Sequence, residues 1–301
     1  MANFSTQDGN NTSEMNNAST STLLTSIFVF LSALNIFLSI TASLGNALII
    51  VALQKETSLH PPTTLLFRSL AVTDFFAGLV SQPLFAVSVM TRIIKMNYLN
   101  EGYIVTGFIL CGISVLTSTS ISVDRLLALL LGLRYRHVVT LRRTRAVIVC
   151  FFVTGISCGT MHFLNKNIAW IAVIIFGVIS LITSIFSYTT IYVRLQQHQA
   201  QLKNHTYKGG IPLNLTRYKR TVSSIAWVQL ALVGCYLPYF IMSILRLSIT
   251  TNGKLIEVLY LAAVTQIYLN SSLNPILCCW KIREVRQAAK DTLRQAFRVS
   301  R

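Results

Sequence analysis

The sequence has 301 residues, of which 53% are hydrophobic and only 12% charged, and its mean hydropathy is +0.59. Soluble domains carry roughly 25% charged residues, so this composition argues against every soluble class and indicates a membrane protein. The formal net charge of +17 is compatible with nucleic-acid binding, but the way the basic residues are ordered along the chain favours a membrane protein without nucleic acid.

The first 22 residues contain Asp8 and Glu14, no lysine or arginine, and many asparagines, serines and threonines. Such a composition predicts a disordered extracellular tail over 1–22. Acceptor sequences for N-glycosylation occur at Asn3, Asn10, Asn11 and Asn17, so the tail is predicted to be glycosylated. The apolar run that follows is too long and begins too late for a cleavable signal peptide.

Seven apolar runs follow the tail, each long enough for a helix that crosses a bilayer. They cover residues 23–53, 63–90, 99–131, 146–163, 167–195, 220–247 and 255–280. The boundary between the fourth and fifth runs is the weakest, because only His162, Asn165, Lys166 and Asn167 mark it. The predicted fold class is an all-α membrane protein, a seven-transmembrane helix bundle over 23–280.

The 26 lysines and arginines are biased toward one side of these runs. Five lie on the other side, namely Arg92, Lys95, Lys166, Arg246 and Lys254. The remaining 21 lie in or beside the loops after the first, third and fifth runs and in the tail after the seventh. By the positive-inside rule this bias places the C-terminus in the cytoplasm and the N-terminus outside. The basic cytoplasmic face also attracts anionic membrane lipid.

The segment 281–301 changes character. Apolar side chains of 281–298 recur on one helical face and basic ones cover the other, which predicts a short amphipathic helix on the membrane surface. Cys279, just before this segment, is either a palmitoylation site or a plain buried cysteine.

Prolines mark helix starts and bends. Pro61 and Pro62 suit the first turn of the second helix. Pro238 and Pro275 are interior to the sixth and seventh runs, where each leaves a carbonyl free four residues earlier, at Gly234 and Ser271. Such sites are either hinges or tolerated kinks.

Several polar residues interrupt the apolar runs, where they are energetically costly and mark function. Asp74 and Ser114 lie midway along the second and third runs, and Asn270, Ser271 and Asn274 share one side of the seventh. One carboxylate with several neutral oxygens predicts a site for a small hard cation such as sodium. The alternative is an Asp74 that is protonated or hydrogen-bonded to Asn46 and Asn274.

Asp124 and Arg125 end the third run. They form either a local ion pair that a partner competes for or an arginine that snorkels to the membrane boundary. The sequence contains no HExxH motif or phosphate-binding loop and only nine acids, so no enzymatic activity is predicted.

The order of several short motifs is similar to that of the rhodopsin-like (class A) G-protein-coupled receptors over about 23–297. The matching residues are Gly45-Asn46, Leu70-Ala71-Val72-Thr73-Asp74, Ser122-Val123-Asp124-Arg125-Leu126, Tyr188 with Ile191, Cys235-Tyr236-Leu237-Pro238 and Asn270-Ser271-Ser272-Leu273-Asn274-Pro275. Each motif alone is weak, but their order across seven runs is specific.

The resemblance implies particular roles for these residues. It implies a sodium pocket at Asp74, Ser114, Asn270, Ser271 and Asn274, with no other cofactor. It implies that Asp124, Arg125, Leu133 and Tyr188 serve coupling to a heterotrimeric G protein, whose α subunit meets Arg125 once the sixth helix swings outward about Pro238.

The sequence departs from the family pattern at Tyr236, Cys278, Leu126, Phe152, Ser180 and Asn100. Asn100 stands where the outer disulfide cysteine is expected, Ser180 replaces the proline of the fifth helix, and the second outer loop is short. These three features resemble the melanocortin branch of the melanocortin, adenosine and cannabinoid-like receptors. The acidic peptide-binding positions of that branch hold Leu84, Asn100 and Ile104, which argues against the same peptide recognition.

The resemblance also places a ligand pocket among the outer halves of the helices. Gly107 replaces the amine-binding aspartate and Tyr268 the retinal lysine, so neither a biogenic amine nor retinal is implied. The predicted pocket consists of Gly107, Phe108, Cys111, Tyr236, Tyr239, Phe240, Ser243, Tyr260, Val264 and Tyr268. These residues either pack the core or line an apolar pocket for a neutral or lipid-like small molecule or a small peptide.

The predicted function is a plasma-membrane receptor that binds an extracellular ligand and activates a heterotrimeric G protein. Two alternatives stay open on the sequence alone. One is a seven-helix ion transporter, and the other is a receptor-like protein with weak or constitutive signalling, which the altered residues Tyr236 and Cys278 motivate.

Overall fold

The computed structural model describes residues 5–55, 60–93, 100–206, 215–248 and 253–281, together with 286, 287, 290 and 294. Of these residues, the backbone alone is described for 5–18, 55, 93, 100, 198–206, 215–229, 247–248 and 280–281. The helices of these residues are, in chain order, α1 (Ser5–Lys55), α2 (Pro61–Phe76), the π-helix η1 (Ala77–Ser81), α3 (Gln82–Ile93), α4 (Asn100–Leu131), the 3₁₀-helix η2 (Gly132–Arg134), α5 (Tyr135–Val138), α6 (Leu141–Leu164), α7 (Lys166–Thr206), α8 (Leu215–Ser248) and α9 (Lys254–Lys281).

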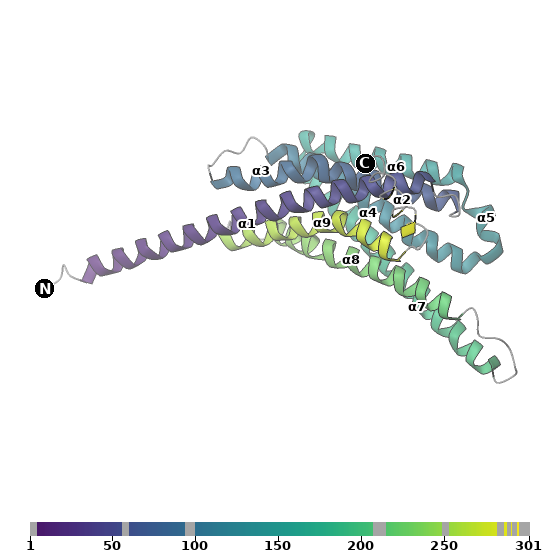
Figure 1. Cartoon of the computed structure of the whole chain (residues 1–301). Coiled ribbons are helices and arrows are strands. Elements are labelled where there is room, and N and C mark those ends of the chain that lie inside the picture. The colour runs from purple at the N-terminus through teal and green to yellow at the C-terminus, as the bar shows by residue number, and fades with distance from the viewer. Residues whose placement is uncertain are drawn as a thin grey trace.

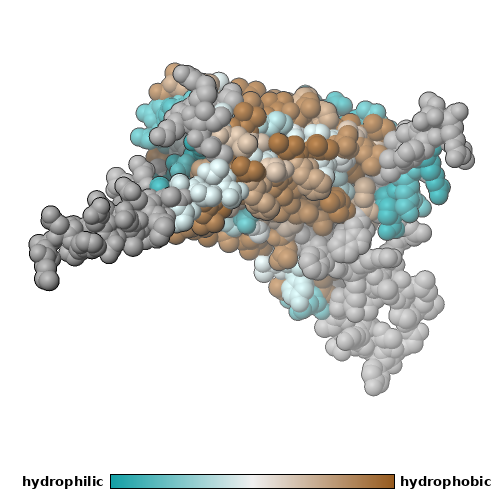
Figure 2. Space-filling model, turned by 60° about the vertical axis from the view of Figure 1, so that its left-hand side comes forward, coloured by the Kyte–Doolittle hydropathy of each residue, from teal (hydrophilic) through white to brown (hydrophobic). Residues whose placement is uncertain are grey.

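Because α2, η1 and α3 follow one another without a break, the described residues form seven long helical spans that lie alongside one another (Figure 1). The predicted seven-helix fold is therefore confirmed. Within the described residues, five spans are apolar and long enough to cross a bilayer, and α8 contains the shorter apolar stretch Leu230–Arg246. Figure 2 shows hydrophobic residues over the middle of the visible face and hydrophilic ones toward its two ends, as a bilayer requires.

Two segments differ from the sequence prediction. Helix α1 begins at Ser5, so 5–22 is helical in the structure rather than disordered, and α7 continues to Thr206, past the predicted end of the fifth run. Once a helix exists, each added residue gains a backbone hydrogen bond, which favours extension from an apolar span. Most of the predicted amphipathic segment 281–298 lies outside the described residues.

The weakly marked boundary between the fourth and fifth runs is a single residue. Asn165 has an extended backbone (φ −151°, ψ 104°) that ends α6. Its side-chain Oδ1 accepts a hydrogen bond from the backbone N–H of Ile168 at 3.1 Å, which satisfies a free donor at the start of α7. At the other predicted helix start, Pro61 and Pro62 occupy the first positions of α2.

The π-helix η1 is the main irregularity of the second span. Its Gly78 carbonyl accepts a hydrogen bond from Ser39 Oγ of α1 at 2.6 Å. A Cβ atom on Gly78 would lie 2.9 Å from the Cβ of Ala42, so only glycine allows this close approach of α1. Such π-turns often occur at functional sites, and here the turn begins three residues after Asp74 and ends at Ser81.

We refer to the two ends of the bundle by a residue that each carries. The Arg125 end contains the end of α4, η2, α5 and the start of α6, and the Glu101 end contains the start of α4, the end of α6 and the start of α7. Helix α4 packs against α2, α6 and α7, and α1 packs against α9. This central position of α4 lets its residues contribute to a site at every level of the bundle.

Candidate functional site

The first polar centre lies around Asp74, in the middle of the bundle. Ser114 Oγ and Ser271 Oγ each donate to Oδ1 of Asp74 at 2.8 Å, and Asn274 Nδ2 donates to Oδ2 at 2.6 Å. The Asp74 side chain is fully buried, and the other three are at least 94% buried. We call these four residues the Asp74 pocket; it joins α2, α4 and α9.

Asn46 supports this pocket without touching the carboxylate. Its Nδ2 donates to the carbonyl oxygens of Ala42 at 2.8 Å and Ser271 at 3.0 Å. The Ser271 carbonyl is the one that Pro275 leaves free in α9, so Asn46 satisfies the polar group that the proline exposes. A Cβ on Gly45 would lie 2.9 Å from Cγ of Pro275, which explains why a glycine faces this proline.

The donor set of the Asp74 pocket fits a small cation in part. In the part of the chain that the structure describes, no basic side chain pairs with Asp74, and a buried carboxylate without a counter-charge is costly. Each serine hydroxyl keeps lone pairs after donating its hydrogen. Asn270 is also buried, and its Nδ2 has no hydrogen-bond partner among the described residues.

A largely apolar cavity lies beside this pocket, toward the Glu101 end. It offers about 80 Å³ to the centres of water-sized molecules, which is small beside the ~300–1,000 Å³ of typical ligand sites. Its wall is made of Tyr103, Ile104, Gly107, Phe108, Cys111, Gly112, Val115, Leu116, Thr154, Gly155, Cys158, Trp170, Val173, Phe176, Gly177, Tyr236, Tyr239, Phe240, Tyr260, Val264, Ile267 and Tyr268. None of these side chains carries a formal charge. We call this site the apolar cavity.

Nine of the ten pocket residues named from the sequence line the apolar cavity, and Ser243 does not. Ser243 is buried in α8. The sequence reading missed the contributions of α6 and α7, among them Gly155, Trp170 and Gly177. No charged or strongly polar side chain marks these positions in the sequence, so only the packing of the helices reveals that they face the cavity.

The hydroxyl of Tyr268 is tied to the second span. It lies 2.7 Å from Oγ of Ser81, and Thr106 Oγ1 donates to the same Ser81 oxygen at 3.2 Å. The ring of Tyr268 packs on Phe85 with centroids 5.5 Å apart. This bond fixes the Tyr268 hydroxyl, one of the few polar atoms of the largely apolar wall.

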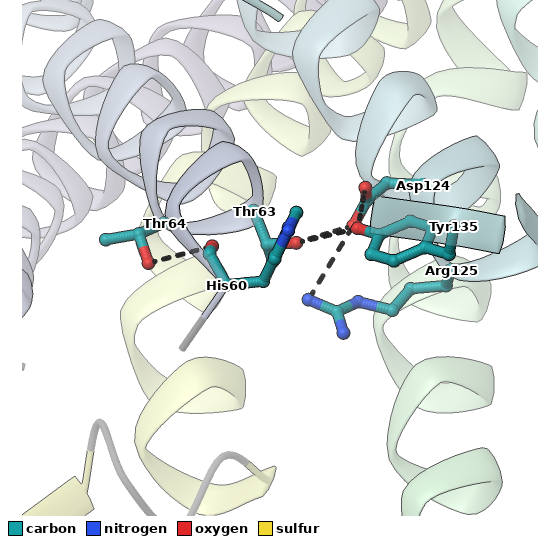
Figure 3. Close-up of polar contacts among 6 residues, drawn as sticks. All are labelled: His60, Thr63, Thr64, Asp124, Arg125 and Tyr135. Atoms are coloured by element: carbon teal, nitrogen blue, oxygen red, sulfur yellow. Dashed lines mark hydrogen bonds and ion pairs between the residues drawn. The ribbon is translucent and has the colours of Figure 1, made fainter. Parts of the chain in front are cut away.

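A second polar centre lies at the Arg125 end (Figure 3). Thr63 Oγ1 donates to Oδ2 of Asp124 at 2.9 Å, and Tyr135 OH donates to Oδ1 at 2.6 Å. Arg125 Nη2 lies 3.8 Å from Oδ2 of the same carboxylate, beyond hydrogen-bonding distance. The ring of His60 tilts against that of Tyr135 at 5.1 Å. The sequence reading singled out Asp124 and Arg125 but missed these three partners.

Because Asp124 is 3% exposed and accepts two hydrogen bonds, it is satisfied without its neighbour. The Arg125 side chain is 29% exposed, and its guanidinium lies 5.8 Å from the ring centre of Phe67. The arrangement therefore combines the two sequence alternatives, a weak ion pair and a partly exposed cation.

The remaining predicted residues lie as follows. Leu133 is 96% exposed, next to Gly132, whose φ of +49° favours glycine. Tyr188 is half-buried in α7 and stacks on Tyr192 at 6.4 Å. Of the glycosylation residues, Asn3 and the side chains of Asn10, Asn11 and Asn17 lie outside the described residues.

All six cysteines, Cys111, Cys150, Cys158, Cys235, Cys278 and Cys279, are free.

A cluster at the Glu101 end joins α4, α6 and α7, because Glu101 bonds both His162 Nε2, at 2.6 Å, and Lys166 Nζ. The buried His162 ring meets Phe108 edge-on at 5.6 Å, so this polar cluster abuts the cavity wall.

The chain is similar to known receptors along most of its length. The family described as 7 transmembrane receptor (rhodopsin family) matches residues 45–170 and 165–277. A melanocortin receptor 5 from Rattus norvegicus is 24% identical over 282 residues, which cover 87% of this chain and 84% of the relative. The G-protein coupled receptor 12 of Homo sapiens is 25% identical over 82% of this chain and 76% of its own length. The adenosine receptor A2b of Homo sapiens is 33% identical over 45% of this chain and 40% of its own length. The chain therefore belongs to the rhodopsin family of seven-transmembrane receptors and is a multi-pass G-protein-coupled receptor.

Proposed function

We propose that this receptor lies in the plasma membrane with its N-terminus outside, binds an uncharged ligand in the apolar cavity, and activates a heterotrimeric G protein at its Arg125 end. The bias of lysine and arginine toward this end supports the orientation. The uncharged cavity wall supports the ligand class, because a buried charge on the ligand needs a partner that this wall does not offer.

The observation that carries the proposal is the weak pairing of the Arg125 guanidinium with Asp124. Its guanidinium lies 3.8 Å from a carboxylate that is already satisfied by Thr63 and Tyr135. An arginine with donors left over, on a face that also presents the exposed Leu133, suits a protein partner that supplies carbonyl acceptors and an apolar pocket.

The proposed coupling between the two ends runs through α8. Tyr236 lines the cavity, and Pro238 lies inside the same helix two residues later. The proline removes one backbone hydrogen bond and frees the carbonyl of Gly234, so the helix is bent most easily there. A ligand that shifts Tyr236 would swing the part of α8 toward the Arg125 end outward and uncover Arg125.

We also propose that the Asp74 pocket holds a sodium ion. The carboxylate of Asp74 and the hydroxyl oxygens of Ser114 and Ser271 would be its ligands, with Asn270 and Asn274 beside them. The ion would supply the positive charge that this buried carboxylate lacks. The chain's own residues hold three helices together at this point whether or not the ion is bound.

The test is nucleotide exchange on purified heterotrimers of the main G-protein classes, with the receptor in nanodiscs and no added ligand. We expect at least one class to exchange faster with receptor than with empty nanodiscs, and we expect Arg125→Ala to remove this increment. Arg142→Ala, which removes another exposed arginine at the same end, is the matched control. Equal exchange by wild type and Arg125→Ala would refute the assigned role of Arg125.

A further inference from the structure

The apolar cavity is closed toward the Glu101 end by a layer of aromatic rings. Trp170 meets Phe108 edge-on at 5.0 Å and Tyr260 at 6.3 Å. Tyr239 packs on Tyr260 at 6.0 Å, and the guanidinium of Arg246 covers the same ring at 4.3 Å. Phe108, Tyr239 and Tyr260 are each at least 94% buried, so little water reaches the cavity through the rings.

The wall formed by α6 and α7 reaches the outer surface of the bundle. Phe176 of α7 lines it and is nevertheless 43% exposed on the outer surface of the bundle. Thr154 of α6 and Val173 of α7 also line it and are half-buried. Gly112 of α4 also lines the cavity, and a Cβ there would meet no atom within 4 Å. The cavity wall therefore includes residues of α6 and α7 that are partly exposed on the outer surface of the bundle.

The surface around the seam between α6 and α7 faces lipid. Val153 and Ile156 of α6 are 59% and 50% exposed, and Ile179 of α7 is 56% exposed. These residues lie within the apolar spans Leu141–Leu164 and Lys166–Gln197. A molecule that reaches the seam from outside the bundle must therefore come through the hydrocarbon of the bilayer.

The wall also specifies the chemistry of the occupant. Its polar atoms are mostly tyrosine hydroxyls, and the buried hydroxyl of Tyr236 makes no hydrogen bond within the described residues. The free volume of about 80 Å³ suits a slender chain better than a compact ring system, because a chain fills a narrow space without displacing the rings. A hydroxyl or ester on such a chain gives the tyrosines a partner without burying a charge.

We propose that the apolar cavity takes a neutral single-chain lipid, which enters from the bilayer through the seam between α6 and α7. This inference rests on the proposed role of the cavity as the ligand site and names its ligand class and entry route. The lipid's chain lies along the aromatic wall, and its polar group meets the tyrosine hydroxyls.

The binding test uses a monoacylglycerol with a diazirine in its acyl chain, incorporated into nanodiscs that contain the full-length receptor. After photolysis, mass spectrometry of peptides reports which helices carry the label. We expect label on cavity residues of α4, α6 and α7, and we expect an excess of unmodified monoacylglycerol to remove it. Label on outer surfaces alone would overturn the proposal.

Two glycine variants form a matched pair for this test. Gly112→Leu places a side chain in the empty part of the cavity, and Gly253→Leu makes the same change at an exposed position before α9, where the nearest atom to a Cβ lies at 3.9 Å. We expect Gly112→Leu to lower cavity labelling by roughly tenfold or more, since an overfilled cavity opposes a ligand. Gly253→Leu should leave labelling unchanged. Equal cavity labelling in both variants would also overturn the proposal.

The entry route is tested by mixing receptor nanodiscs with vesicles that carry the probe and firing the photolysis flash after increasing delays. Phe176→Trp enlarges the side chain at the seam and should slow cavity labelling severalfold, whereas Trp170→Ala, which opens the aromatic layer, should not speed it. The reverse pattern would show entry from the Glu101 end and refute the lateral route. Labelling requires neither agonist nor G protein, so its failure with intact nucleotide exchange refutes only this inference.

Discussion

The Asp74 pocket and the apolar cavity are neighbours that are built in opposite ways. Ser114 and Val115 are consecutive in α4, yet Ser114 bonds Asp74 and Val115 lines the cavity. In the pocket, three hydrogen bonds of 2.6–2.8 Å fix one carboxylate. In the cavity, rings from four helices surround a space that few polar atoms mark. The pocket is specified by discrete bonds and the cavity by shape.

This difference indicates what each site tolerates. A hydrogen-bonded centre loses its organisation when one partner is removed, because the remaining buried groups stay unsatisfied. A packed cavity is insensitive to many apolar exchanges but sensitive to added volume at points where backbone and ring touch. The variants below separate these two behaviours.

The largest expected effect is at the contact between α7 and α8 in the cavity wall. A Cβ on Gly177 would lie 1.9 Å from Cζ of Phe240, so Gly177→Ala should destabilise the receptor by about 1–3 kcal/mol through overpacking. The additional change Phe240→Leu should restore most of the loss. Thermal unfolding in one detergent measures both variants.

The matched control for this prediction is Gly112→Ala, because the same methyl group there meets no atom within 4 Å. In a helix this change is expected to be neutral or to stabilise by about 0.5–1 kcal/mol. If Gly177→Ala were as stable as Gly112→Ala, shape would not specify the cavity.

The Asp74 pocket should respond to sodium. We expect the wild-type receptor to unfold at a higher temperature in sodium chloride than in choline chloride at equal ionic strength. The gain is about 1.4 kcal/mol when sodium is ten times its dissociation constant. Asp74→Asn should abolish this difference.

Asp124→Asn, which removes a buried carboxylate from the other polar centre, should keep the sodium response. A response that survives Asp74→Asn would instead assign the sodium effect to another part of the molecule.

The Asp74 pocket and most helix bounds could be predicted from the sequence. The grouping of Asp74 with Ser114 and Asn274 was readable because polar residues are costly in apolar spans and must find partners there. Helix bounds were readable to within a few residues for most spans, because the bilayer sets their length. Only the helical extensions at Ser5 and Thr206 lay well beyond the predicted runs.

The shape of the cavity was not readable from the sequence. Nothing in the sequence around Gly155 and Gly177 distinguishes them from other glycines. They matter because Ile113 and Phe240 occupy the space that a side chain at these positions would need. Likewise, nothing in the local pattern marks Tyr135 as a partner of Asp124, since the contact depends on how η2 and α5 turn the chain back.

A smaller effect is expected at the Arg125 end, where hydrogen bonds also organise a buried carboxylate. Tyr135→Phe removes the donor to Oδ1 of Asp124 and leaves that oxygen free to accept from Arg125. The loss of one such bond is worth about 1 kcal/mol. We therefore expect basal nucleotide exchange to fall by about fivefold, because the arginine is held more firmly.

Tyr192→Phe is the control for this prediction, since the Tyr192 hydroxyl bonds Gln196 on an exposed face instead of the Asp124 cluster. It should leave basal exchange unchanged. A rise in exchange on Tyr135→Phe would mean that Tyr135 restrains the receptor rather than freeing Arg125.

The smallest expected effect is at the hydrogen bond between Tyr268 of the cavity wall and Ser81. A double-mutant cycle of Tyr268→Phe and Ser81→Ala reports the coupling across their 2.7 Å contact. Hydrogen bonds between membrane helices average about 0.6 kcal/mol in such cycles. The same cycle for Asp74→Asn and Ser114→Ala should give a larger coupling, because hydrogen bonds to an ionised carboxylate are roughly twice as strong. If the Tyr268 pair were the stronger one, discrete bonds would specify the cavity as much as the Asp74 pocket, and the contrast between the two sites would not hold.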